Sequence, residues 1–114
     1  MAQDNSTDKV YIRKGYHESG ALGYEIPYKK GRKHGIEKWY YESGALQFET
    51  PYVDGKRHGI EKWYYESGAL QYETPYKNDN EHGVEKNYDE YSTDIKCLAL
   101  YNNGVNVASV RFDT

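Results

Sequence analysis

The sequence contains a single cysteine, Cys97, among its 114 residues, which excludes an internal disulfide and a zinc site built from several cysteines. Phenylalanine and methionine are also scarce, with two residues and one, whereas tyrosine occurs fourteen times. Because tyrosine joins an apolar ring to a polar hydroxyl, this composition favours a thin sheet with water near both faces over a thick, dry core.

Long apolar runs are absent as well. No segment is apolar over the length that a membrane-spanning helix needs, and the first ten residues, MAQDNSTDKV, lack the basic and apolar regions of a secretory signal. We therefore expect the protein to stay in the cytoplasm.

Proline occurs only three times, at the evenly spaced positions Pro27, Pro51 and Pro75. The segment HGIEKWYYESGAL follows the same period, because it is identical at His34–Leu46 and His58–Leu70. Fixed self-similarity of this length is typical of stacked repeats, in which each unit covers its neighbour. We predict one repeat domain over residues 10–114 with irregular end units, preceded by a disordered tail over residues 1–9.

Each repeat has the pattern of a β-hairpin. The runs IEKWYYE and LQFETPY are rich in aromatic and β-branched residues, and the turn between them contains Gly44. A second turn at Asp54 and Gly55 leads to the next unit, and we expect Pro51 at the end of its strand because proline interrupts a ladder. The prediction is an all-β fold: an antiparallel sheet of stacked hairpins with period 24.

Alternation along the second strand places Leu46, Phe48 and Tyr52 on one face. Stacking of the units in register then predicts a row of Tyr24, Phe48 and Tyr72. At the ends, Val10–His17 resembles a first strand without its tryptophan, Ile95–Gly104 matches LQFETPYVDG, and VASVRF offers one more strand.

The pattern YYESGALQFETPYVDGKRHGIEKWYYESG resembles the MORN repeat variant, over roughly Tyr16–Gly104. The resemblance implies an elongated, twisted sheet of successive hairpins, in agreement with the pattern of the residues. Bacterial proteins with this variant resemble the YwqK type, which is described as an antitoxin component, and related repeats are associated with membranes or protein scaffolds. The resemblance supplies no catalytic residue.

Rows of histidine and glutamate recur with the repeat, but their spacing does not suit catalysis or metal binding. Equivalent residues of successive hairpins are roughly 10 Å apart, too far to share one ion. No nucleophile elbow, phosphate-binding loop or metalloprotease motif is present. We therefore expect no enzyme activity, no metal and no cofactor. The rows in question are His34, His58 and His82, and Glu42 and Glu66.

Charge is distributed unevenly along the chain. Residues 1–57 carry ten Lys/Arg and eight Asp/Glu, a net charge of +2, whereas residues 58–114 carry five and ten, a net charge of −5. The turns that return the chain to the next hairpin, KKGRK, VDGKR and KNDNE, change from +4 through +1 to −1. This gradient is either drift on solvated loops or a graded edge that orients a partner.

The candidate partner-binding residues are aromatic anchors and basic turn residues, both of which protein interfaces use. They are Trp39, Trp63, Tyr41 and Tyr65, with Lys29, Lys30, Arg32, Lys33, Lys56 and Arg57.

The leading hypothesis is a non-catalytic protein-binding module, by resemblance an antitoxin or immunity protein that neutralises a toxin or effector. An alternative is a phage-encoded, anti-CRISPR-like inhibitor of a bacterial defence nuclease. Binding of nucleic acid through aromatic platforms, or of anionic membranes through KKGRKH, is a further alternative that the negative net charge opposes. The sequence leaves the oligomeric state open.

Overall fold

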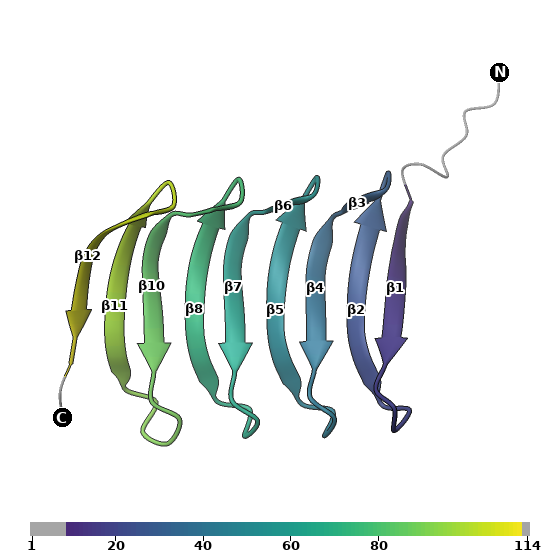
Figure 1. The fold of residues 1–114 in the computed structure, drawn as a ribbon, viewed down its shortest axis with the longest axis horizontal. Helices are drawn as coiled ribbons and strands as arrows, with labels where there is room; N and C mark the ends of the chain where they lie inside the picture. Colours follow the sequence, from purple (N-terminus) through teal and green to yellow (C-terminus); the bar gives the residue numbers. More distant parts are fainter. Residues whose placement is uncertain (1–8, 113–114) are drawn as a thin grey trace.

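The structure, a computed structural model, describes residues 9–112 and contains one antiparallel sheet of twelve strands (Figure 1). Nine long strands follow one another across the sheet in chain order, and three two-residue strands pair beside them at the return turns. The strands are β1 (Val10–Tyr16), β2 (Leu22–Lys29), β3 (Arg32–Lys33), β4 (Gly35–Tyr40), β5 (Leu46–Val53), β6 (Lys56–Arg57), β7 (Gly59–Tyr64), β8 (Leu70–Lys77), β9 (Asn80–Glu81), β10 (Gly83–Tyr88), β11 (Ile95–Asn102) and β12 (Val105–Arg111).

The sheet is a single layer that measures 64 × 38 × 17 Å. Strands β4, β7 and β10 begin at Gly35, Gly59 and Gly83, so they recur at the interval of the prolines, which confirms the predicted fold of stacked hairpins. The strands expected at both ends of the chain are present as β1, β11 and β12. The tail predicted for residues 1–9 lies outside the described residues except for Lys9, which is exposed.

The return turns join each hairpin to the next one. Asp54 and Gly55 both have positive φ, 49° and 84°, as a two-residue type I′ turn requires. The Gly55 amide donates to the Lys33 carbonyl at 2.8 Å, so this turn also rests on the turn before it. The sequence prediction of a turn at this dipeptide is confirmed.

Pro51 lies inside β5 and pairs with Ile36, so the prediction that it ends the strand was wrong. Its carbonyl accepts a hydrogen bond from the His58 amide at 3.0 Å. The N–H and C=O of one strand residue point to the same side, so the missing donor of Pro51 faces the break between β6 and β7 rather than a ladder. Gly59 lies against this proline, because a Cβ there would be 2.9 Å from Pro51 Cγ.

One face of the sheet, the aromatic face, carries an unbroken row of five rings contributed by successive long strands. Centroid distances along the row are 4.7, 6.0, 4.3 and 5.7 Å. The row consists of Tyr24, Trp39, Phe48, Trp63 and Tyr72. The predicted row of Tyr24, Phe48 and Tyr72 is therefore present, and the tryptophans are inserted between its members because β4 and β7 lie between the second strands.

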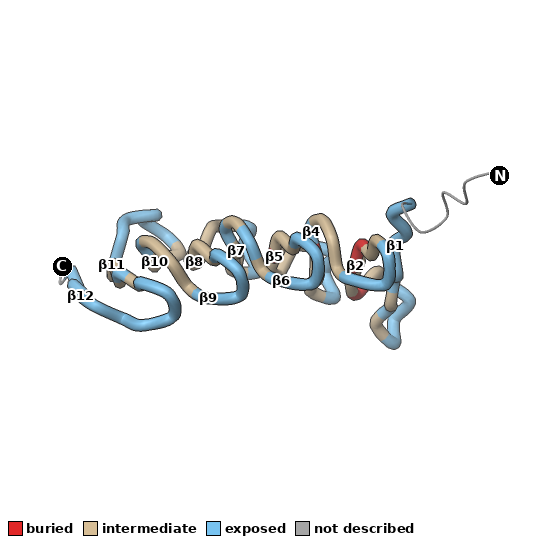
Figure 2. Tube along the Cα trace, turned by 90° about the horizontal axis from the view of Figure 1, so that it is seen from above, coloured by how far each residue is buried: buried red, intermediate tan, exposed pale blue. Residues whose placement is uncertain are grey.

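The core is a thin strip on the aromatic face. Beside the ring row, Thr50 and Thr74 are 2% exposed, and Ile26 and Glu37 are 7% exposed. Ile26 is the one buried hydrophobic residue among those the structure describes. Figure 2 shows buried residues at β2 and exposed residues along β12. Leu46 is only half-buried.

Candidate protein-binding surfaces

The return turns lie side by side at one end of the strands (Figure 1). The first two of these turns are basic, and we call this side of the sheet the basic edge. Lys33 donates to Glu37 at 2.7 Å and lies 4.9 Å from the centroid of the Tyr52 ring. Burial alone lowers the pKa of Lys33, but the hydrogen bond and charge of Glu37 outweigh it, and the pKa is raised. The Lys33 side chain thus packs on the aromatic face of its own sheet.

Arg57 is the equivalent residue of the next unit and is also engaged within the chain. Its guanidinium lies 4.3 Å from the centroid of the Tyr76 ring, and its Nε donates to Asp79 at 3.3 Å. The backbone amide of Arg57 also donates to Asp79, and these bonds lower the pKa of that carboxyl. Arg32 and Lys56 are exposed, as is Lys30, whereas Lys29 is half-buried.

Trp39 and Trp63 are half-buried members of the ring row. The Trp63 indole donates to Glu61 at 3.0 Å, and Glu61 accepts a second hydrogen bond from Thr50 at 2.8 Å. The Trp39 indole donates to Glu37 in the same way. A carboxylate therefore sits beside each tryptophan, which makes this part of the aromatic face acidic as well as aromatic.

Tyr41 and Tyr65 lie at the opposite edge of the sheet, beside the turns that contain Ser-Gly. Their hydroxyls donate to the backbone carbonyls of Tyr64 and Tyr88 at 2.7 and 2.8 Å. His17 makes the corresponding contact in the first unit, with its Nε2 2.9 Å from the Tyr40 carbonyl. These side chains link successive hairpins.

The ten predicted residues therefore do not form one site. Their side chains lie at the basic edge, in the ring row and at the opposite edge. Their role in binding a partner stays a prediction, and the exposed basic residues among them are Lys30, Arg32 and Lys56.

The other face, which we call the Ile–Pro face, exposes an apolar stripe that the sequence analysis missed. In successive strands the stripe pairs Ile12 with Pro27, Ile36 with Pro51, Ile60 with Pro75, and Val84 with Leu100. Its isoleucines, valine and leucine are 42–55% exposed, whereas Pro27 is buried and Pro51 and Pro75 are half-buried. The signal was present in the even spacing of the prolines, which places all three on the same face as the isoleucines.

A row of alternating charges runs beside this stripe on the Ile–Pro face. Each residue of the row pairs with the next across the sheet. Tyrosine hydroxyls on the same face donate to its three glutamates. We call this row the Lys/Glu ladder: Lys14, Glu25, Lys38, Glu49, Lys62, Glu73 and Lys86.

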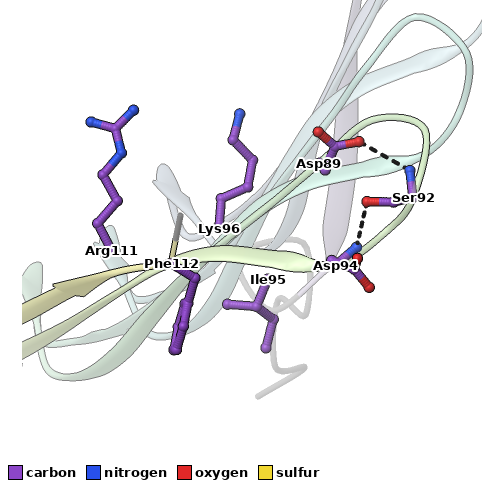
Figure 3. A pocket seen from close by; sticks show the side chains of 7 residues that line it. All are labelled: Asp89, Ser92, Asp94, Ile95, Lys96, Arg111 and Phe112. Carbon is purple, nitrogen blue, oxygen red and sulfur yellow. Dashed lines mark hydrogen bonds between the residues drawn. The ribbon is translucent and has the colours of Figure 1, made fainter. Parts of the chain in front are cut away.

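A shallow hollow of about 300 Å³ lies near the C-terminal end of the sheet (Figure 3). Asp89 accepts hydrogen bonds from the amides of Ser92 and Tyr91 at 3.0 and 2.9 Å, and these bonds lower the pKa of its carboxyl. Its Oδ1 therefore stabilises the loop that joins β10 to β11. Within residues 9–112, no group of three or more His, Cys, Asp or Glu side chains is placed to hold a metal ion.

Comparison with known proteins identifies the repeats. The family model of the MORN repeat variant matches residues 33–54 and 57–78, two segments that begin one repeat period apart. These two segments are therefore similar to MORN repeats. No curated protein matches the sequence. The part of the chain that the structure describes contains no helix that is long and apolar enough to span a membrane.

One solved structure resembles the fold. It is a chain in the crystal structure of accessory secretory protein 1, 2 and 3 from Streptococcus pneumoniae, with a TM-score of 0.48 and 10% sequence identity. The match covers 88% of this chain and 18% of that chain.

Proposed function

We propose that this MORN repeat module is a non-catalytic, protein-binding inhibitor of the antitoxin or immunity type. It acts in the cytoplasm by holding a toxin or effector protein against its sheet. The main support for the proposal is that the described residues form a single layer of β-sheet. Domains generally bury a sheet against a second layer, whereas the described residues of this chain bury one hydrophobic side chain. The open sheet therefore offers a large area to a partner.

The basic edge supports a partner with an acidic surface. The exposed Arg32 and Lys56 lie on successive return turns that are linked by a backbone hydrogen bond, so they are held on a fixed frame. Charges at the rim of an interface mainly steer the encounter. A rigid sheet edge held across an active site would block substrate access without any chemistry.

Nucleic acid fits this surface less well. Glu37, Glu61 and Glu85 recur beside the ring row, and Glu37 and Glu61 are hydrogen-bonded to the tryptophans themselves. Bases that stacked on these rings would bring their phosphates close to carboxylates, and phosphate contacts dominate nucleic-acid affinity.

The experiment is a growth rescue. Each open reading frame that flanks the gene is expressed from an inducible promoter in a laboratory bacterium, with and without this chain. We expect one neighbour to arrest growth and the chain to restore it. The double variant Arg32→Glu, Lys56→Glu should fold and rescue poorly, whereas Lys96→Glu, a charge reversal in the last units, should rescue normally. If no flanking product is toxic, or if the double variant rescues as well as the parent, the proposal fails.

A further inference from the structure

The Ile–Pro face carries a row of charges that is complementary to its own reversed copy. Its exposed stripe crosses eight strands from β1 to β11, and the Lys/Glu ladder crosses seven of them. The ladder alternates strictly, with lysine on β1, β4, β7 and β10 and glutamate on β2, β5 and β8. A row of alternating charges can meet its own reversed copy with opposite charges in contact, provided that the two-fold axis falls between two strands.

The position that satisfies this condition is the centre of the stripe. A two-fold axis parallel to the strands, between β5 and β7, brings β5 of one copy over β7 of the other, β4 over β8, β2 over β10 and β1 over β11. Glu49 then faces Lys62, Lys38 faces Glu73, and Glu25 faces Lys86. All six contacts in the pair of copies join opposite charges, which is the condition that a self-complementary interface must meet.

The geometry points to a homodimer in which two copies pack by their Ile–Pro faces about this axis. The same operation places apolar residues on apolar residues, with Ile36 over Pro75 and Pro51 over Ile60. Packing two sheets face to face would supply each with the second layer that it lacks as a single chain.

The charge gradient of the return turns agrees with this arrangement. Under the two-fold axis, the turn at residues 29–33, with charge +4, faces the turn at residues 77–81, with charge −1. The middle turn at residues 53–57 faces itself, so that Asp54 of one copy lies near Lys56 of the other. The gradient along this edge therefore has a use within a pair of identical chains, separate from the proposed steering of another protein.

The available area is sufficient for a dimer. Eight strands spaced about 4.8 Å apart span roughly 35 Å, and three rows of side chains on one face add roughly 20 Å along the strands. The footprint is then about 700 Å² on each copy, close to the area of about 800 Å² that each partner buries in a standard interface.

The test uses purified chain alone and exchanges the charges of one contact. Sedimentation equilibrium of the parent should give a mass twice the 13.3 kDa of the chain. Lys38→Glu and Glu73→Lys should each weaken the dimer by at least about tenfold, because each creates two like-charge contacts per dimer. An equimolar mixture of the two variants should regain nearly the affinity of the parent, since each mutant charge then faces its complement. Circular dichroism shows that each variant keeps its fold.

A second variant tests the apolar stripe. Ile60→Lys should make the chain monomeric, whereas Tyr91→Lys, which changes an 89% exposed ring in a loop, should leave the dimer intact. A monomeric parent at 100 µM, a charge exchange that the mixture does not rescue, or a dimer that survives Ile60→Lys would each overturn the proposal. A dimer that pairs through the edge strand β12 would survive Ile60→Lys and would thus be recognised. None of these measurements involves a toxin, so their failure is distinct from failure of the proposed function.

Discussion

Removal of Trp63 tests whether the ring row stabilises the sheet. The indole stacks on Phe48 at 4.3 Å and on Tyr72 at 5.7 Å, and donates to Glu61. Two aromatic contacts contribute about 1–3 kcal/mol beyond area burial. Full truncation of a buried tryptophan costs about 3–5 kcal/mol, and this ring is half-buried. We therefore expect Trp63→Ala to lower the free energy of unfolding by about 2–4 kcal/mol, measured by urea titration followed by circular dichroism.

The control is Trp63→Phe, which keeps a ring between Phe48 and Tyr72 and removes the indole N–H. Glu61 then retains its hydrogen bond from Thr50, so we expect a loss of about 1–1.5 kcal/mol. If Trp63→Ala costs less than about 0.5 kcal/mol, the stacked geometry contributes no stability and the reasoning is wrong. A stable Trp63→Ala variant that fails to bind a partner would instead favour the ring as an interface anchor.

Three further outcomes are expected. Gly59→Ala should destabilise the protein more than Gly68→Ala, because both glycines have positive φ but only a Cβ at position 59 would meet a rigid ring, that of Pro51. Equal losses of unfolding free energy in urea titrations of the two variants would contradict this contact. Leu46→Ala should cost about 1–2 kcal/mol rather than the larger loss of a fully buried leucine, and a melting curve identical to that of the parent would place the side chain in solvent. Stability should fall as pH rises from about 10 to about 12, because burial above all raises the pKa values of four tyrosines. Their protonated forms stabilise the fold below pH 10, and this stability is lost as the pH approaches 12; a free energy of unfolding that stays constant over this range would count against the prediction. The four are Tyr40, Tyr72, Tyr76 and Tyr88, with pKa about 12.

Much of the architecture could be predicted because the turns and strands of each repeat depend on residues within that repeat. Asp54 and Gly55 have to form a tight turn wherever the unit lies, and alternation in LQFETPY places Phe48 and Tyr52 on one face. The register shift beside Tyr40 interrupts this alternation at Leu46. Pro51 was placed incorrectly because its effect depends on which side of the strand lacks a partner. That side is known only when the break between β6 and β7 is seen.

The candidate site was less predictable because its residues contact side chains that are distant in sequence. Trp63 and Arg57 have the composition of interface anchors. In the folded chain, however, Trp63 packs between Phe48 and Tyr72, and Arg57 binds Asp79, 22 residues away. Exposure is a property of the assembled sheet, and residue type does not determine it.

The period, the hairpins, the turns and the strands at both ends follow from the residues alone, because local backbone preferences and side-chain alternation repeat in every unit. Which face is filled and which is open becomes known only when the strands are assembled. Stacked rings form a continuous row beside the buried Thr50 and Thr74 on one face, while the isoleucines of the other face stay about half exposed. That difference depends on how neighbouring strands bring rings into contact, which no single repeat specifies.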